Sequence, residues 1–349
     1  MKKILFTGGG SAGHVIPNIA LIEELLSDGN TEICYMGTSG IEKDLIAEWD
    51  IPFYEISCPK LIRGRSREAW KRNLRIPVEL RRAKRQALEI LEKIRPHAVF
   101  SKGGYVALPV IAAAKKLGIP CFAHESDFSP GLANRLTARK CLKVFTSFPE
   151  AAKRLPHGTY SGAPLRRSIF HPTRAEARKQ MSIPFHAQVL LVFGGGSGST
   201  AINQALREHL KTLTENYVVL HVCGKGNLTE TNLKNYRQFE FITDMGMMYA
   251  CADLVISRAG AGTVFELLAL KKPAILVPLE GQTRGDQAEN AAYFQAKGLC
   301  KVLKQDFLFT LPRAVDETFA DDEMRQRLKE SDFHSGNERI LQELRKVLQ

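Results

Sequence analysis

Residues 2–18, KKILFTGGGSAGHVIPN, join a short apolar run to a glycine-rich loop and a helix-like segment. A strand, a glycine turn and a helix in this order are typical of a doubly wound α/β domain. Gly8, Gly10 and Gly13 also match the G-x-G-x-x-G dinucleotide pattern. That pattern needs an acidic residue at the end of the second strand, but the second apolar run ends CYMGT at 34–38. The match alone is therefore weak evidence for a nicotinamide cofactor.

The same pattern restarts at residues 189–206, VLLVFGGGSGSTAINQAL. The chain of 349 residues is long enough for two domains of this kind. We predict an α/β protein with two Rossmann-like, doubly wound domains that join near residues 161–164. The first domain is expected to span 1–163 and the second 164–334. The last helical segment, 335–349, can pack back on the first domain.

Eleven apolar runs are predicted to be strands. Such runs, separated by amphipathic stretches, are typical of parallel strands covered on both faces. They occupy residues 3–8, 32–37, 52–57, 98–103, 120–126, 143–148, 189–195, 217–224, 254–260, 273–279 and 299–303. Ligands of open parallel sheets bind beyond the carboxyl ends of the strands. We therefore expect the glycine-rich strand ends at 8–13, 194–198 and 259–262 to surround one cleft.

Composition and charge reduce the number of functional classes to which the protein can belong. Seven cysteines are scattered singly without a C-x-x-C pair, which argues against a disulfide framework or a zinc site. No apolar run approaches the roughly 18–20 residues of a membrane span, and we expect no signal peptide. The net charge is +12, and residues 60–85 alone carry 11 basic and two acidic residues. Such a segment attracts an anionic partner, which can be nucleic acid, anionic lipid or a phosphorylated substrate.

The third glycine-rich loop is the best candidate for a diphosphate. In residues 256–268, ISRAGAGTVFELL, the helix is expected to begin near 260–263. Its N–H groups would meet phosphate while Glu266 reaches a ribose diol. Arg166, just after the domain join, could neutralise the diphosphate. We find no D-x-D pair and no acidic or histidine cluster at ligand spacing, so we predict neither a metal nor a cofactor.

Eight segments then fall in order along nearly the whole chain: GGGSAGHVIPN, SKGGYVALP, HESDFSPGLANR, GAPLR, FGGGSGS, EFITDM, SRAGAGTVFE and RGDQAENA. Together they resemble the MurG family. Its members transfer N-acetylglucosamine from UDP-N-acetylglucosamine to the 4-hydroxyl of the muramoyl unit of undecaprenyl-pyrophosphoryl-MurNAc-pentapeptide (lipid I), which forms lipid II for peptidoglycan. The resemblance implies the GT-B architecture, with two domains facing a central cleft, and an inverting transfer without a metal.

The resemblance also implies partners and a location. The partners would be UDP-N-acetylglucosamine, the undecaprenyl-linked acceptor lipid, an anionic membrane surface and proteins of cell-wall synthesis or division, with no nucleic acid. The protein would be peripheral, on the cytoplasmic face of the inner membrane. The substrate-binding positions carried over are Ser11, Ala12, Gly13, Asp127, Arg166, Ser197, Ile242, Ala261, Gly262, Thr263, Glu266, Asp286 and Gln287.

Roles follow from the matching positions. The first loop would lie near the transferred sugar and the acceptor, and the backbone of Ile242 would hold uracil. Arg166 and Ser197 would contact the diphosphate and nucleoside, while Asp286 and Gln287 would contact sugar hydroxyls. The chain departs from the family pattern at two places. Ser11 and Ala12 stand where threonine and glycine are usual, and Asp127 stands where many members have asparagine.

The base that takes the proton from the acceptor hydroxyl has three candidates. His14 is the first, because it adjoins the glycine loop and imidazole titrates near neutral pH. His14 can instead cap a helix or hydrogen-bond the acceptor diphosphate. Glu125 and Asp127, after the strand at 120–126, are the rival bases.

The basic segment is expected to contact the membrane. Trp70, Leu74 and Val78 follow i, i+4 spacing with cations such as Arg75 between them. An apolar stripe flanked by cations suits an anionic membrane surface. Pro77 is expected to break or start a helix. The following apolar positions are predicted to face the core: Leu80, Ala83, Ala87, Leu91 and Ile94.

Other functions remain open at this point. A GT-B transferase acting on diacylglycerol and a non-hydrolysing UDP-N-acetylglucosamine epimerase would share the architecture. A nicotinamide-dependent oxidoreductase would use the first loop, but the acid after the second strand is missing. Nucleic-acid binding through residues 60–85 has no aromatic sheet motif or recognition helix to support it.

Overall fold

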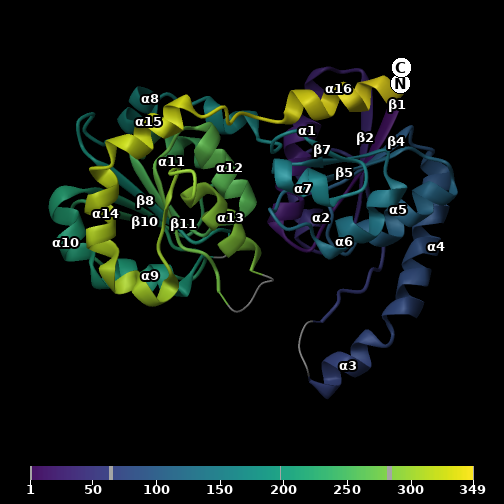
Figure 1. The fold of residues 1–349 in the computed structure, drawn as a ribbon, viewed down its shortest axis with the longest axis horizontal. Coiled ribbons are helices and arrows are strands. Elements are labelled where there is room, and N and C mark those ends of the chain that lie inside the picture. Colours follow the sequence, from purple (N-terminus) through teal and green to yellow (C-terminus); the bar gives the residue numbers. More distant parts are fainter. Residues whose placement is uncertain (1, 63–65, 197, 281–284, 349) are drawn as a thin grey trace. The chain divides into compact units, whose positions relative to one another are not determined.

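The computed structural model describes residues 2–62, 66–196, 198–280 and 285–348, and the chain divides into two compact units. Unit 1 comprises Met1–Arg166 and Ser335–Gln349, and unit 2 comprises Arg167–His334. The boundary lies after Arg166, so this arginine belongs to unit 1 although it was expected in the second domain. Each unit contains one parallel sheet with helices on both faces (Figure 1).

The sheet of unit 1 has seven parallel strands in the order β3-β2-β1-β4-β5-β6-β7. The strands are β1 (Lys2–Thr7), β2 (Thr31–Gly37), β3 (Phe53–Glu55), β4 (Ala98–Ser101), β5 (Cys121–Glu125), β6 (Lys143–Thr146) and β7 (Gly158–Tyr160). The helices are η1 (Ala12–His14), α1 (Ile16–Ser27), α2 (Ile41–Ala47), α3 (Arg67–Asn73), α4 (Ile76–Ile94), α5 (Ala107–Lys116), α6 (Leu132–Thr137), η2 (Ala138–Lys140), α7 (Pro149–Arg154) and α16 (Asn337–Leu348). The strand order reverses between β1 and β4, which is where ligands of such sheets bind.

Two hydrophobic cores cover the faces of this sheet. Successive residues of a strand point to opposite faces, so Leu5 joins the core under α4 and α5 while Ile4 and Phe6 join the core under α1. The second core also contains the buried face of α16. Asn337, at the start of α16, bonds both the N–H and the carbonyl of Leu165, at 3.0 and 2.9 Å. These contacts hold the C-terminal helix in unit 1.

The sheet of unit 2 has six parallel strands in the order β10-β9-β8-β11-β12-β13. The strands are β8 (Val189–Phe193), β9 (Val218–Val222), β10 (Tyr236–Phe239), β11 (Leu254–Ser257), β12 (Ala274–Leu276) and β13 (Lys301–Val302). The helices are η3 (Arg167–Phe170), α8 (Arg174–Gln180), α9 (Thr200–Glu208), α10 (Leu210–Asn216), α11 (Met245–Cys251), α12 (Ala261–Ala269), α13 (Asp286–Gln295), η4 (Gln305–Thr310), α14 (Leu311–Phe319) and α15 (Asp322–Glu330).

The predicted fold class, two doubly wound α/β domains, is confirmed, and each of the eleven apolar runs contains a strand. Two strands were missed, β7 (GTY) and β10 (YRQF). Both lie at the edge of a sheet. An edge strand has one open side and tolerates polar residues, so these two strands lack the apolar run that marks an inner strand.

The basic segment forms an arm of unit 1. In Figure 1, α4 extends beyond the sheet and α3 lies at its far end. Pro77 lies in the first turn of α4. It therefore starts a helix, which is one of the two roles expected for it. The stripe from Ala83 to Ile94 is buried and Leu80 is half-buried. Trp70 and Leu74 are 67% and 58% exposed.

Candidate active site

Three loops meet at the carboxyl edge of the unit 1 sheet. Thr7, the last residue of β1, pairs with Ser101, the last residue of β4. Ser101 pairs in turn with Ala123 of β5, so β5 continues to Glu125 beyond this level. The predicted site residues of the first glycine loop and of the segment after β5 therefore share one edge, with the loop after β4 between them.

The glycines of the first loop allow other segments of the chain to pack closely against it. A Cβ atom on Gly8 would lie 2.6 Å from the carbonyl oxygen of His14, and one on Gly10 would lie 2.6 Å from the Tyr105 ring. Gly104 has a φ of +78°, and its Cβ would lie 2.5 Å from the carbonyl oxygen of Gly9. Side chains at these positions would force the loops apart. The glycine loops after β1 and β4 are thus pressed together.

A buried carboxylate closes the first loop from the other side. Glu42, on α2, accepts hydrogen bonds from Gly10 N at 3.1 Å, Thr38 N at 3.0 Å and Thr38 Oγ1 at 2.6 Å. Burial raises the pKa of Glu42, but the bonds from Thr38 and Gly10 outweigh it and leave the pKa below its usual value. The Glu42 carboxylate therefore already accepts a hydrogen bond from the Gly10 N–H. A dinucleotide phosphate bound at this loop would need that N–H. Glu42 was not predicted as part of the site.

His14 and Ser11 lie together at the start of the following helix. Residues Ala12–His14 form a turn of 3₁₀ helix before α1, and the His14 N–H donates to the Ser11 carbonyl at 3.0 Å. Ser11 Oγ lies 3.0 Å from His14 Nδ1. When Nδ1 carries the proton and donates it to Ser11, Nε2 is the basic nitrogen of the ring. The pair is suited to hold an imidazole in the tautomer that a general base needs.

Glu125 is buried and bonds to the loop that follows it and to α6. Its carboxylate accepts hydrogen bonds from Asp127 N at 3.0 Å, Gly131 N at 2.7 Å and Asn134 Nδ2 at 2.9 Å. Burial and the nearby Asp127 raise the pKa of Glu125. A carboxylate with this geometry shapes the loop after β5, whereas Asp127 in the same loop is only half-buried.

In unit 2, the N-terminus of α12 is open. Gly260 precedes the helix with a φ of −64°, and α12 receives no side-chain cap. In the same unit, Ser199 caps α9 and Asp244 caps α11, whereas α10, α13 and α14 also receive no side-chain cap. A Cβ on Gly260 or Gly262 would meet no described atom within 4 Å. Uncapped N–H groups with free space beside them are the features that a bound phosphate requires.

Glu266 lies on α12, one turn further along. Its side chain is 8% exposed, and its Oε2 accepts a hydrogen bond from the Tyr249 hydroxyl at 2.8 Å. Tyr249 is itself buried on α11. The pair fixes the carboxylate relative to the helix N-terminus, where Ala261, Gly262 and Thr263 form the first turn. An immobilised carboxylate in this place can accept hydrogen bonds from a diol.

The loop that leads into α12 is held by Arg258. Its guanidinium donates to the carbonyls of Val277 and Pro278 at 3.2 and 3.1 Å, and to Gln305 Oε1 at 2.9 Å. Burial lowers the pKa of Arg258, and Glu280 raises it. This residue was not predicted as part of the site. The bonds connect the ends of β11 and β12 and position the open helix N-terminus.

Three further predicted positions, Ile242, Asp286 and Gln287, follow strands of this unit, whereas Arg166 belongs to unit 1. Ile242 is half-buried in the segment between β10 and α11. Asp286 and Gln287 begin α13, and Gln287 Oε1 accepts a hydrogen bond from Leu279 N at 2.9 Å. Ser197 lies outside the described residues. Among the described residues, no group of three or more His, Cys, Asp or Glu side chains is arranged to hold a metal ion.

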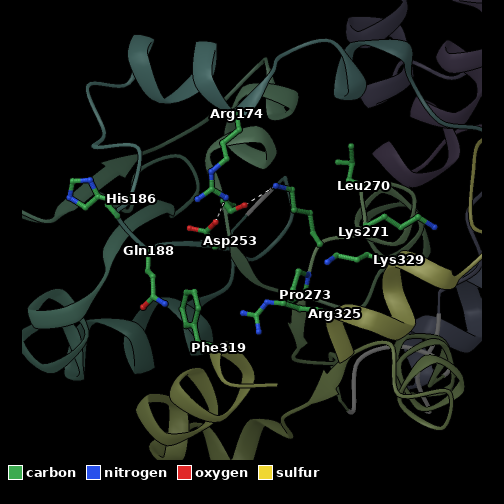
Figure 2. Close-up of a pocket in the computed structure, with 13 residues that line it drawn as sticks. Arg174, His186, Gln188, Asp253, Leu270, Lys271, Pro273, Phe319, Arg325 and Lys329 are labelled. Atoms are coloured by element: carbon green, nitrogen blue, oxygen red, sulfur yellow. Dashed lines mark hydrogen bonds and ion pairs between the residues drawn. The ribbon is translucent and has the colours of Figure 1, made fainter. Parts of the chain in front are cut away.

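A cavity of about 420 Å³ lies at the opposite, amino edge of the unit 2 strands (Figure 2). Several cations in and around it have partners. Arg174 and Arg178 pair with Asp253, and Lys272 Nζ donates to the Ala252 carbonyl at 2.7 Å. Burial lowers the pKa of Lys272 to about 8, while Asp253 raises it. These contacts stabilise the ends of helices, and the cavity holds none of the predicted site residues.

Family models match both units. The glycosyltransferase family 28 N-terminal domain matches residues 4–146, and the C-terminal domain of the same family matches residues 189–344. The crystal structure of MurG from Acinetobacter baumannii superposes with a TM-score of 0.77 and 26% identity, over 99% of this chain and 100% of that one. The expected GT-B class with two Rossmann-like domains is therefore confirmed.

Curated relatives extend over most of the chain. A protein of Clostridium kluyveri is 45% identical over 313 residues, which cover 88% of this chain and 87% of the relative. A protein of Lachnospira eligens is 42% identical over 330 residues, which cover 92% of each chain. Both are named UDP-N-acetylglucosamine--N-acetylmuramyl-(pentapeptide) pyrophosphoryl-undecaprenol N-acetylglucosamine transferase. The chain therefore belongs to glycosyltransferase family 28, and within it to the MurG family that its motifs resemble.

Proposed function

We propose that this glycosyltransferase transfers N-acetylglucosamine from UDP-N-acetylglucosamine to the 4-hydroxyl of undecaprenyl-pyrophosphoryl-MurNAc-pentapeptide, the reaction of its named relatives. The observation that carries the proposal is the open N-terminus of α12, with free space beside Gly260 and Gly262. Glu266 follows on the same helix and is fixed by Tyr249. A site that takes a diphosphate at the helix N-terminus and a ribose at Glu266 would suit a nucleotide sugar.

The donor would be bound mainly by unit 2. The N–H groups of Ala261, Gly262 and Thr263 would face the diphosphate, whose charge the helix dipole stabilises. The backbone of Ile242 would hold the uracil, with Ser197 contacting the nucleoside and Arg166 the diphosphate. Asp286 and Gln287 would contact hydroxyls of the transferred sugar.

The reaction would be a direct displacement with inversion. The acceptor oxygen bonds to the anomeric carbon while the bond from this carbon to UDP breaks, and the electron pair leaves with the diphosphate. His14 Nε2 takes the hydroxyl proton, and Ser11 holds the tautomer. Preorganised N–H donors at the leaving group are worth about 3–4 kcal/mol each in comparable sites. Under this proposal the dipole of α12 and Arg166 carry the charge of the leaving group without a metal.

The arm of unit 1 would bind the membrane. Trp70, Leu74 and Val78 are 67%, 58% and 66% exposed on one segment, and exposed cations such as Arg75 lie between them. Each basic residue near an anionic surface contributes about 1 kcal/mol. Within the described residues, no helix has the length and apolar character needed to span a bilayer. We infer a peripheral attachment at the cytoplasmic face, where the acceptor lipid would be reached.

The function is tested by transfer of labelled N-acetylglucosamine to a short-chain analogue of the lipid acceptor, with EDTA present. Product should form from UDP-N-acetylglucosamine, and UDP-glucose should give much less. A thermal-shift panel of UDP, the two UDP sugars and NAD provides a second readout. Stabilisation by NAD alone, or transfer that stops with EDTA and returns with a divalent ion, would contradict the proposal.

Membrane binding is tested separately by flotation with liposomes. Trp70→Ala with Leu74→Ala should lose binding to vesicles that contain anionic lipid. Phe309→Ala is the matched control, because Phe309 is 68% exposed on unit 2 and has no place in the arm. Equal binding of the native protein to neutral vesicles would contradict the electrostatic part of the proposal.

A further inference from the structure

The cavity at the amino edge of the unit 2 sheet is strongly basic. It measures about 420 Å³ and is lined by residues that precede β8, β11 and β12 and by α15. This volume lies within the range of pockets that bind small molecules. Of the described residues that line it, Asp253 alone is acidic, and five are basic: Arg174, Lys271, Lys272, Arg325 and Lys329. The lining therefore carries a surplus of positive charge.

The carboxylate of Asp253 is already shared by two arginines. Arg174 pairs with its Oδ1, and a guanidinium nitrogen of Arg178 lies 2.7 Å from its Oδ2. The same Oδ2 accepts a hydrogen bond from Val189 N at 2.8 Å. One carboxylate charge thus faces two guanidinium charges, so Asp253 cannot also neutralise the lysines of the cavity.

Lys271 has a structural role outside the cavity. Its Nζ donates to Ser331 Oγ at 3.0 Å and to the Phe333 carbonyl at 3.4 Å. Figure 2 shows its side chain pointing away from the middle of the cavity. These bonds connect the turn after α12 to the segment after α15, and they account for this lysine without a ligand.

Lys272 has a structural contact that uses only part of its ammonium group. Its Nζ donates to the Ala252 carbonyl at 2.7 Å, at the end of α11, where a cation is favourable. An ammonium has three N–H donors, and this is the one hydrogen bond that it makes with a described residue. Burial lowers the pKa of Lys272 to about 8, Asp253 raises it, and the charges of Arg174 and Arg178 lower it. Lys272 therefore lies among like charges with donors to spare.

Arg325 and Lys329 are not explained by such contacts. They lie four residues apart on α15, so they share one face of the helix. Figure 2 shows their cationic ends turned toward the cavity. Arg325 bonds to its own helix turn, at 3.3 Å to the Asp321 carbonyl and 3.6 Å to the Asp322 carboxylate, and Lys329 makes no hydrogen bond or ion pair with a described residue. Like charges at this spacing repel each other, so an anion between them would stabilise both.

We propose that this cavity is a second binding site, for a phosphate-bearing anion, separate from the donor site proposed at the carboxyl edge of the same sheet. Arg325, Lys329 and the remaining N–H groups of Lys272 hold the phosphate, because guanidinium and ammonium groups make strong hydrogen bonds to its oxygens. Phe319 and Pro273 line the same cavity and contact an apolar part of the molecule. The phosphate group can belong to a free small molecule or to a lipid headgroup, and two arms of the test separate these sources.

The first arm titrates inorganic pyrophosphate into the protein by calorimetry with UDP at saturation, so that the proposed donor site is already filled. The variants are Lys329→Met, Arg325→Met and the two combined, since methionine is a long, flexible side chain without charge. Lys211→Met is the matched control, because Lys211 is exposed on α10 of the same unit and does not line the cavity. Thermal unfolding checks that each variant is folded. The second arm measures flotation of the same proteins with vesicles that contain phosphatidylglycerol.

The native protein should bind pyrophosphate with UDP present, and the affinity should fall as salt is added. Lys329→Met and Arg325→Met should each weaken binding by roughly tenfold, the loss expected for one charge-assisted hydrogen bond. The combined variant should lose more than either, and Lys211→Met should match the native protein. If pyrophosphate does not bind but the combined variant floats less than Lys211→Met, the site takes the phosphate of a lipid headgroup, which also supports the proposal.

Two results would overturn the proposal. One is that pyrophosphate does not bind and flotation is the same in all variants. The other is that Lys211→Met weakens binding as much as Lys329→Met, because the anion would then be attracted by the general positive charge of the protein. If Arg325→Met fails to fold, Lys329→Met decides alone, since Lys329 is exposed. The outcome does not depend on the proposed transferase reaction, because no variant in the series changes a residue of the proposed donor site.

Discussion

The first glycine loop of unit 1 and the loop before α12 in unit 2 differ in what lies beside them. The loop of unit 2 that matches the first loop in sequence is itself packed, since a Cβ on Gly194 or Gly198 would lie 2.3 Å from protein atoms. In unit 1, protein atoms fill the space where a Cβ of Gly8, Gly10 or Gly104 would lie. In unit 2, no described atom comes within 4 Å of a Cβ placed on Gly260 or Gly262. The first set of glycines is required by packing, and the second leaves room for a ligand. A glycine motif therefore locates a strand end without saying which of these two roles it serves.

This difference implies that the two units have different roles in the reaction. The packed loops of unit 1 form a rigid support for His14 and Ser11, with Glu42 closing one side. The open loop of unit 2 presents the uncapped end of α12. Chemistry should therefore be sensitive to changes in unit 1, and donor binding to changes in unit 2.

The largest effect is expected for His14→Ala. Removal of a general base should lower turnover by about 10²–10⁴-fold, and binding of UDP by unit 2 should not change. The measurements are initial rates with the short-chain acceptor and calorimetric titration of UDP. His186→Ala serves as the control, because His186 is exposed in unit 2. A turnover number close to that of the native protein would remove His14 from the role of base.

A matched pair of alanines tests the comparison of the loops directly. Gly104→Ala places a side chain at a φ of +78° and 2.5 Å from the Gly9 carbonyl, which should cost about 2–4 kcal/mol of stability. Gly260→Ala meets no described atom within 4 Å and should change stability by less than about 0.5 kcal/mol. It should instead weaken binding of UDP-N-acetylglucosamine, because its methyl group enters the proposed diphosphate space.

Denaturant unfolding followed by tryptophan fluorescence suits this pair. The chain has two tryptophans, Trp49 and Trp70, and both lie in unit 1. Fluorescence therefore reports the unit that Gly104→Ala should destabilise, and calorimetry reports donor binding. Equal stability of the two variants would refute the distinction between packed and open loops.

Much of the fold was predictable from the sequence because it follows from local patterns. The inner strands are apolar runs, and the glycine loops mark where they end. The edge strands β7 and β10 escaped because they are polar, whereas the edge strands β3 and β13 lie in apolar runs. The neighbours of each loop could not be predicted, because α2 and the segment after β4 reach the first loop only through the tertiary fold.

The motifs in the sequence point to only some of the residues that the structure brings together at the candidate site. The motifs named His14 and Glu266 because these side chains lie next to their own glycine loops in the sequence. Glu42 was missed because it acts on the first loop from another element. A signal for Glu42 was present, since an acid follows a second turn, GTSG, after β2. Arg258 was missed because its partners follow the next strand, β12, or lie in η4.

A smaller effect is expected for Glu42→Gln, which tests the closure of the first loop. The amide places a donor where the loop N–H groups need an acceptor, which should cost about 1–3 kcal/mol. Because the pKa of Glu42 is lowered on folding, its contribution is present above the usual carboxyl range and is lost as the pH falls through the folded pKa. The native protein should thus lose more stability than Glu42→Gln on acidification.

Unfolding at neutral pH and at about pH 4, near the usual glutamate pKa, measures this difference. Glu92→Gln is the control, since Glu92 is exposed on α4. If Glu42→Gln and Glu92→Gln unfold alike, the Glu42 carboxylate does not hold the loop. Donor binding should be the same in all three proteins, because unit 2 contains neither residue.

The smallest effects are expected for alanine substitutions of two serines that have different roles. Ser11→Ala removes the hydroxyl 3.0 Å from His14 Nδ1, worth about 1 kcal/mol and hence roughly a fivefold loss of turnover. Ser199→Ala removes the cap of α9 in unit 2 and should cost about 1 kcal/mol of stability without lowering turnover at saturating donor. Ser11→Thr retains the hydroxyl and should restore turnover. A rate loss in Ser199→Ala equal to that in Ser11→Ala would mean that chemistry depends on both loops, and the separation of roles would fail.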